Sequence, residues 1–147
     1  MDDIAVMAGS VPRIMVVDDD RAFREMLRDL LAEEGFAVVA EAGDGAEAVV
    51  AAERTTPDVV LMDLRMPNVD GIQATRSIKE LQPLVQVIML SAYGDPALQR
   101  GAEDAGVYCY LIKGCPPSMI KDVLEFAWSY KVGLEDAEGA AGLPPAS

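Results

Sequence analysis

In the stretch RIMVVDDDRAF, residues 13–23, a short apolar run ends directly in three adjacent aspartates. Short aliphatic runs are typical of strands that are buried on both faces, and polar residues mark where such strands end. Neighbouring like charges repel each other, so Asp18, Asp19 and Asp20 require a structural reason. Comparable runs recur along the chain, and the expected strands are Ile14–Val17, Ala37–Ala40, Val59–Met62, Val85–Leu90 and Val107–Ile112.

The segments between these runs carry apolar residues at helical spacing. Asp95 before Pro96 fits an N-cap followed by the first helical residue, and Pro116–Pro117 or Ser118 opens the last helix. The predicted apolar stripes are Phe23, Met26, Leu27, Leu30 and Leu31; Ala46, Val49 and Val50; Ala74, Ile78 and Leu81; Leu98, Ala102 and Ala105; and Ile120, Val123, Leu124, Ala127 and Trp128.

The alternation of strands and helices predicts an α/β fold, a doubly wound five-stranded parallel sheet with helices on both faces. The first, third and fourth runs are continuously apolar, which favours central positions in the sheet. The second run is followed by Glu41 and the fifth contains two tyrosines, which favours the edges. These preferences are satisfied by the strand order 2-1-3-4-5.

This order predicts where a functional site lies. Connections leave in opposite directions from the first and third strands, which opens a crevice at their carboxyl ends. The polar residues that end four different strands are Asp18–Asp20, Asp63, Ser91 and Lys113. We therefore expect these groups to converge on one crevice although they are far apart in the sequence.

The composition limits the classes of partner. The 147 residues include 25 acidic and 12 basic ones, a formal net charge of −13. Such a chain repels phosphate backbones and anionic lipids, so we expect no direct binding to nucleic acid or membranes. No apolar run approaches the ~20 residues of a membrane span, and the start MDDIAVMAGSVP is acidic where a signal peptide is basic. These features indicate a cytoplasmic protein.

The chain contains no histidine, which excludes Ser-His triads, histidine acid–base chemistry and histidine-ligated zinc. Cys109 and Cys115 are expected to be reduced thiols. We expect a flexible N-terminus over residues 1–12 and one domain over residues 13–131. Residues 132–147 carry Gly, Ala, Pro and acids without periodicity, which predicts a disordered tail.

Several carboxylates in one cleft raise each other's pKa unless a cation neutralises them. Oxygen ligands without histidine or cysteine favour a hard cation, Mg²⁺ or Mn²⁺. Asp63 could serve as a ligand and also as a nucleophile, because a carboxylate can accept a phosphoryl group covalently. Lys113 and Ser91 would then neutralise and position the transferred charge.

The segments IMVVDDDRAF, VVLMDLRMPNVDGI, VIMLSAYGD and GVYCYLIKG, in this order, resemble the response-regulator receiver domains of two-component signalling. The resemblance covers residues 13 to about 131 and implies a flavodoxin-like (βα)5 fold. It implies that Asp63 is the phosphoacceptor and that Asp18 and Asp19 hold Mg²⁺, with Asp19 the direct ligand. The backbone carbonyl of Arg65 completes the implied metal site.

The resemblance also implies roles outside the metal site. Ser91 matches the hydroxyl that bonds the phosphoryl group, Ala92 its small neighbour, and Lys113 the lysine that pairs with a phosphoryl oxygen. Tyr110 matches the aromatic switch residue. The remaining assignments come from the local sequence: Asp20 caps the first helix, and Tyr93 shields the acyl phosphate from water.

The implied function is phosphorelay signalling rather than enzymatic turnover. The implied phosphoryl donor is a histidine kinase or a phosphotransfer protein. The implied recipient of the signal is a downstream protein partner or an output domain, and a homodimer is also allowed. The switched face would comprise the fourth helix, the fifth strand and the fifth helix. Gly114 departs from many receivers, which have a cis proline after the lysine; a trans bond is expected here.

Two alternatives remain open at the level of sequence. The first is a haloacid-dehalogenase-like phosphohydrolase, in which Asp18 and Asp20 form the DxD signature and Asp18 is the acceptor, although Ala22 replaces its Thr or Val. The second is an interaction module that keeps the fold and works without phosphorylation. The chain could also be a stand-alone receiver or a fragment of a longer regulator.

Overall fold

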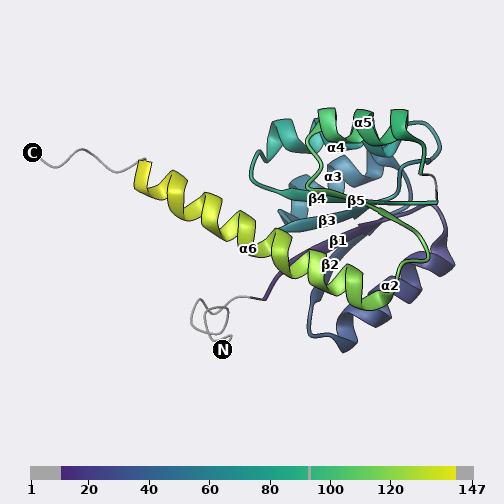
Figure 1. The fold of residues 1–147 in the computed structure, drawn as a ribbon, viewed down its shortest axis with the longest axis horizontal. Coiled ribbons are helices and arrows are strands. Elements are labelled where there is room, and N and C mark those ends of the chain that lie inside the picture. The colour runs from purple at the N-terminus through teal and green to yellow at the C-terminus, as the bar shows by residue number, and fades with distance from the viewer. Residues whose placement is uncertain (1–10, 93, 142–147) are drawn as a thin grey trace, which may run out of the picture.

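A computed structural model describes residues 11–92 and 94–141 of the chain (Figure 1). Strands and helices alternate throughout, as the sequence predicts. The elements are β1 Arg13–Val17, α2 Arg21–Glu33, β2 Ala37–Ala42, α3 Gly45–Thr55, β3 Val59–Met62, α4 Gly71–Leu81, β4 Gln86–Ser91, α5 Pro96–Ala105, β5 Cys109–Ile112 and α6 Pro117–Ala141.

The five strands form one parallel sheet in the order β2-β1-β3-β4-β5, which confirms the predicted fold class and strand order. Every residue of β3 and β4 is buried, and so are four of the five in β1. The edge strands β2 and β5 are only partly buried. Strands covered on both faces must be apolar throughout, and this explains why the sequence pattern identified the central strands.

Two hydrophobic cores lie on opposite faces of the sheet, because successive side chains of a strand point to opposite sides. On one face α3, α4 and α5 cover Met15, Val17 and the side chains beside them. On the other face α2 and α6 cover Ile14, Val16 and their neighbours. Figure 1 shows this three-layer arrangement, with α2 and α6 below the sheet and α3, α4 and α5 above it.

Four residues of the predicted apolar stripes are exposed: Met26, Ala46, Val50 and Leu81. Helix α3 instead buries Ala48 and Ala52, whose small side chains allow the helix to lie close to the sheet. The spacing of apolar residues thus identified the helices correctly, but it overestimated how much of each stripe is covered.

Aspartate caps begin four of the helices. Asp20, Asp44, Asp70 and Asp95 each accept a backbone N–H from the first turn of α2, α3, α4 and α5. A side chain that satisfies one of these otherwise unpaired donors stabilises a helix by about 1 kcal/mol. The predicted capping roles of Asp20 and Asp95 are confirmed, and the last helix begins at Pro117 as expected.

The expected disorder after residue 131 is wrong for residues 132–141, because α6 continues to Ala141. Lys131 pairs with Asp58 at 2.7 Å and with Glu135 at 3.2 Å, which fixes the helix at this point. Adding residues to an existing helix costs much less than starting one, so Ala, Glu and Leu can extend it despite Gly133 and Gly139. Residues 1–10 and 142–147, also predicted to be flexible, lie outside the described residues.

Candidate metal and phosphoryl site

Three carboxylates meet where β1 and β3 end. Asp18 and Asp19 follow β1, and Asp63 follows β3. Backbone hydrogen bonds fix these ends: Asp18 N–H donates to Ala42 O at 3.0 Å, and Asp63 N–H donates to Val17 O at 2.9 Å. One carboxylate oxygen from each of Asp18, Asp19 and Asp63 lies within 4.8 Å of the others. Asp18 and Asp63, which are 45 positions apart in the sequence, therefore lie together as predicted.

Lys113, directly after β5, supplies the positive charge at this cluster. Its Nζ lies 2.6 Å from Asp18 Oδ2 and 3.5 Å from Asp63 Oδ1. The ammonium also lies 4.4 Å from the centre of the Phe23 ring, a cation–π contact from α2. Lys113 N–H donates to Ser91 O at 2.7 Å, which joins the ends of β4 and β5. Lysine therefore bridges the two buried aspartates.

The surroundings shift the pKa values of Asp63 and Lys113. Burial, together with the charges of Asp18 and Asp19, raises the pKa of Asp63 from its usual 3.8 to about 6, although Lys113 opposes this rise. Burial lowers the pKa of Lys113, but its hydrogen bond to Asp18 and the charges of Asp18 and Asp63 outweigh burial and raise it overall. At neutral pH Asp63 is therefore largely ionised and Lys113 is charged.

The carboxylates fit the expected metal. Asp18 and Asp63 are buried, with 2% and 7% of their surface exposed, whereas Asp19 is exposed. Asp18 already accepts from Lys113 at Oδ2 and from Asp20 N–H at Oδ1, at 2.8 Å. Asp19 is thus the carboxylate most open to a cation from solvent. An all-oxygen donor set that carries excess negative charge suits Mg²⁺ or Mn²⁺.

The loop after Asp63 is held in place by a close backbone approach. A Cβ atom at Gly71 would lie 2.1 Å from Asp63 O, so only glycine fits there. Gly71 N–H donates to Leu64 O at 2.7 Å, and Asp70 and Gln73 form a reciprocal capping box. The loop therefore holds a fixed course past Arg65, which lies two residues after Asp63 and is exposed.

Ser91 is fully buried as the last residue of β4, while Ala92 is exposed. Tyr110 is half-buried on β5, where it packs against the core under α3, α4 and α5. It also lines a cleft of about 530 Å³ that Gln99 and Glu103 of α5 border. The roles of Ser91 and Tyr110 as phosphoryl-binding hydroxyl and switch residue stay predictions. Tyr93 lies outside the described residues.

Gly114 follows Lys113 with a backbone φ of +98°. This left-handed conformation favours glycine, and proline, whose φ is fixed near −65°, cannot adopt it. None of the described peptide bonds is cis, which agrees with the expected trans bond. The turn after Lys113 therefore depends on the left-handed backbone conformation of Gly114.

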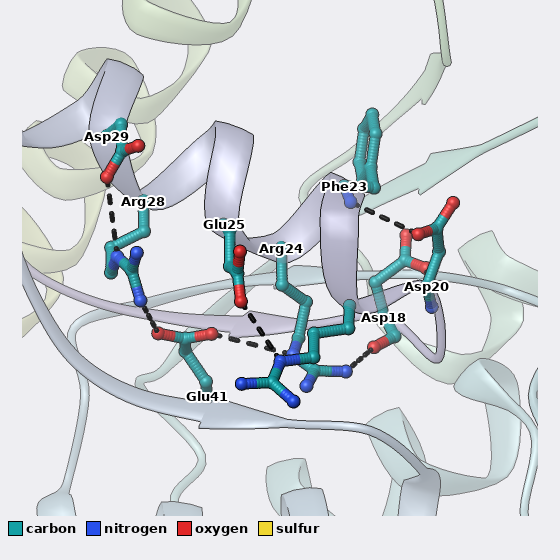
Figure 2. A network of polar contacts seen from close by, with 9 residues as sticks. Asp18, Asp20, Phe23, Arg24, Glu25, Arg28, Asp29 and Glu41 are labelled. Atoms are coloured by element: carbon teal, nitrogen blue, oxygen red, sulfur yellow. Dashed lines mark hydrogen bonds and ion pairs between the residues drawn. The ribbon is translucent and has the colours of Figure 1, made fainter.

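Two residues that sequence reasoning missed also contact the site: Phe23 through its ring, and Arg24 through its guanidinium. Arg24 Nη1 donates to the backbone oxygen of Asp18 at 2.6 Å. Figure 2 shows Arg24 and Arg28 of α2 both reaching Glu41 of β2, at 3.5 and 3.3 Å. The only signal in the sequence was the four-residue spacing of two arginines on the helix that follows the acidic loop.

The strand order, the cluster of three carboxylates and the lysine that contacts two of them are the arrangement that the resemblance to receiver domains implied. The response regulator receiver domain matches residues 14–125, and the chain belongs to this family. Membership identifies it as a domain of two-component signalling, a class of phosphorelay protein. Among the residues that the structure describes, no helix is both long and apolar enough to span a membrane.

Curated relatives support the same family. The chain is 42% identical over 101 residues to the chemotaxis protein CheY of Bacillus subtilis, covering 69% of this chain and 84% of that protein. It is 40% identical over 116 residues to the transcriptional regulatory protein PdtaR of Mycobacterium tuberculosis, covering 78% of this chain. The match spans about half of PdtaR, 55% of its length.

Solved structures share the fold. The receiver domain of the putative response regulator NarL of Mycobacterium tuberculosis has a TM-score of 0.75 and 34% identity, covering 80% of this chain and 97% of that one. A CheY-like receiver from Methanospirillum hungatei has a TM-score of 0.80 over 84% and 98% of the two chains; at 23% identity it shows the fold alone. A CheX–CheY–BeF3–Mg complex from Borrelia burgdorferi is 27% identical, with a TM-score of 0.75 over 80% and 90% of the chains.

Proposed function

We propose that this receiver domain accepts a phosphoryl group on Asp63 from a phosphohistidine of a histidine kinase or phosphotransfer protein. The observation that carries the proposal is the contact of Lys113 with Asp18 at 2.6 Å and with Asp63 at 3.5 Å, inside a cluster of three carboxylates. A lysine held between two buried carboxylates is placed to meet an additional anionic group on one of them.

Asp63 performs the covalent step. A carboxylate oxygen of Asp63 attacks phosphorus, a P–O bond forms, and the P–N bond to the donor imidazole breaks. The imidazole retains the bonding electron pair and takes up a proton, and the product is an acyl phosphate. Because its pKa is about 6, Asp63 is mostly ionised at neutral pH and needs no base to activate it.

The other residues neutralise and orient the transferred group. Lys113 lies beside Asp63 and can pair with a phosphoryl oxygen, and Ser91 at the end of β4 can donate its hydroxyl. Asp18, Asp19, Asp63 and the backbone carbonyl of Arg65 would hold Mg²⁺, which supplies neutralisation of phosphoryl oxygen charge. Charge neutralisation and positioning are what phosphoryl transfer mainly requires.

Phosphorylation would change the face formed by α5, β5 and α6. Ser91 and Lys113 are joined by a backbone hydrogen bond, and β4 and β5 pair from Ile88 with Cys109 to Ser91 with Ile112. A movement at Ser91 is therefore transmitted to Tyr110, which lines the cleft beside α5. The recipient of this signal is a downstream protein, an output domain or a second copy of the chain.

The test is incubation with Mg²⁺ and acetyl phosphate, followed by mass spectrometry of the intact protein. We expect a mass gain of one phosphoryl group, lost in Asp63→Asn and strongly reduced in Asp19→Asn. Asp20→Asn is the matched control, because it removes an exposed charge from the same loop while asparagine still caps α2. An equal gain in Asp63→Asn would refute the assignment of the acceptor.

The phosphohydrolase alternative is not supported, because the chain belongs to the receiver family. Both carboxylate oxygens of Asp18, the acceptor that alternative requires, are already engaged by Lys113 and Asp20 N–H. A module that works without phosphorylation would show no mass gain in the same assay. The assay therefore separates this remaining alternative from the proposal.

A further inference from the structure

We propose that Arg24 is a positioning residue for the metal site: its guanidinium fixes the backbone of the loop that presents Asp18 and Asp19. The inference rests on the proposed function, because it assigns to Arg24 a role in cation binding at that site. Arg24 is a cation and cannot itself be a ligand of the metal. Its Nη1 instead donates to the main-chain oxygen of Asp18 at 2.6 Å.

All four polar groups of Asp18 are engaged. Its N–H donates to Ala42 O at 3.0 Å, and its carbonyl accepts from Arg24. Its Oδ1 accepts from Asp20 N–H at 2.8 Å, and its Oδ2 pairs with Lys113. Arg24 thus supplies one of the two bonds that fix the Asp18 peptide units in this strand end, and the direction of Asp19 follows from their orientation.

Arg24 is itself held firmly. Only 18% of its side chain is exposed, and its backbone N–H donates to Asp20 O at 3.0 Å in the first turn of α2. A Cβ added at Gly43, directly after β2, would lie 3.3 Å from Nη1, so a larger residue there would crowd the guanidinium. Nε is buried without a hydrogen bond and lies 3.5 Å from Glu41 Oε1 as an ion pair.

Arg28 provides a natural comparison on the same helix. It lies four residues further along α2, and its Nη1 contacts the other oxygen of Glu41, Oε2, at 3.3 Å. Figure 2 shows the two arginines on either side of Glu41, with only Arg24 reaching the backbone of Asp18. Removal of either arginine therefore removes one positive charge and one contact with Glu41, but only Arg24 carries the contact with the loop.

The two possible roles of Arg24, as a positioning residue and as a positive charge alone, predict opposite changes in Mg²⁺ affinity when Arg24 is removed. If Arg24 acted only as a positive charge, its removal would reduce repulsion of Mg²⁺ and strengthen binding. If Arg24 positions the loop, its removal releases the Asp18 carbonyl and weakens binding. Loss of a residue that orients metal ligands typically reduces metal affinity by about tenfold or more. The sign of the change therefore identifies the role.

The experiment compares Mg²⁺ affinity by calorimetry for the wild-type chain, Arg24→Met and Arg28→Met. We expect binding about tenfold weaker in Arg24→Met and unchanged or slightly tighter in Arg28→Met. A second readout needs no metal: amide hydrogen exchange of Asp20, whose N–H bonds to Asp18, should accelerate in Arg24→Met only. Equal or tighter Mg²⁺ binding in Arg24→Met, with unchanged Asp20 exchange, would overturn the proposal.

Arg24→Lys covers the case in which Arg24→Met does not fold. Lysine keeps the charge, but its ammonium lies one bond nearer the backbone than Nη1 and loses the short contact with Asp18. Positioning predicts weaker Mg²⁺ binding, by about threefold or more, whereas a role of charge alone predicts no change. If the wild-type chain binds no Mg²⁺, the proposed function fails; if it binds and the Arg24 variants match it, only the positioning role fails.

Discussion

Replacing Asp63 by asparagine should stabilise the metal-free protein at neutral pH. Burial and the neighbouring aspartates raise the pKa of Asp63 from 3.8 to about 6, so ionisation in the folded state is unfavourable. At about 1.4 kcal/mol per pKa unit, this corresponds to about 3 kcal/mol. Asparagine has nearly the same shape and no charge, so Asp63→Asn should recover up to about 3 kcal/mol of unfolding free energy.

The effect has a defined pH dependence. Between pH 3.8 and about 6 the folded state binds the proton of Asp63 while the unfolded state has released it. The stability of the wild-type protein therefore falls as pH rises through this window and levels off above it. The advantage of Asp63→Asn should be absent below about pH 4, grow towards pH 6 and remain constant at about pH 7.5.

Urea unfolding with a chelator present, at about pH 4, 6 and 7.5, measures this difference. Addition of Mg²⁺ should then stabilise the wild-type protein more than Asp63→Asn, because the variant lacks one negative oxygen ligand. Asp20→Asn is the control, and its stability should differ little from wild type at every pH. A destabilised Asp63→Asn variant, or an advantage independent of pH, would refute the electrostatic account of the site.

Three further substitutions test the geometry around the site. Lys113→Met leaves buried Asp18 without its partner at 2.6 Å and should cost about 2–3 kcal/mol in metal-free urea unfolding; a stabilised variant would contradict the bridging role. Gly71→Ala places a Cβ 2.1 Å from the backbone oxygen of Asp63 and should cost about 2–3 kcal/mol, with slower phosphorylation by acetyl phosphate. Gly114→Ala forces alanine into a φ of +98° and should lower stability by about 1 kcal/mol, measured by thermal unfolding; an unchanged midpoint would show that the turn relaxes.

The strand order could be predicted from the sequence, because a strand buried on both faces is a continuous run of apolar residues. Fully covered β3 is Val-Val-Leu-Met, whereas the edge strand β2 ends near Glu41, which pairs with arginines of α2. The convergence of Asp18, Asp63 and Lys113 follows from that order, since parallel strands end at one edge of the sheet. The strand order alone was therefore enough to predict this convergence, without knowledge of individual side-chain contacts.

The parts that could not be predicted depend on long-range contacts between individual side chains. The extension of α6 follows from the pairing of Lys131 with Asp58, residues 73 positions apart, and no local periodicity encodes it. The contact of Arg24 with the carbonyl of Asp18 involves a main-chain atom, which every residue possesses. The sequence therefore showed that an arginine was present without showing what it holds.

Helix α6 is longer than the part of it that packs against the core. Its first half, with Ile120, Leu124 and Ala127, is built into the core, and Lys131 pins it to Asp58 at the start of β3. The ten residues beyond Lys131 extend the helix by about 15 Å, and its last turns project from the body of the domain in Figure 1. A tilt of these ten residues by about 10° would displace the far end of α6 by about 2.5 Å. The last turns of α6 would thus turn a small rotation near the core into a displacement of the helix end that is large enough to measure.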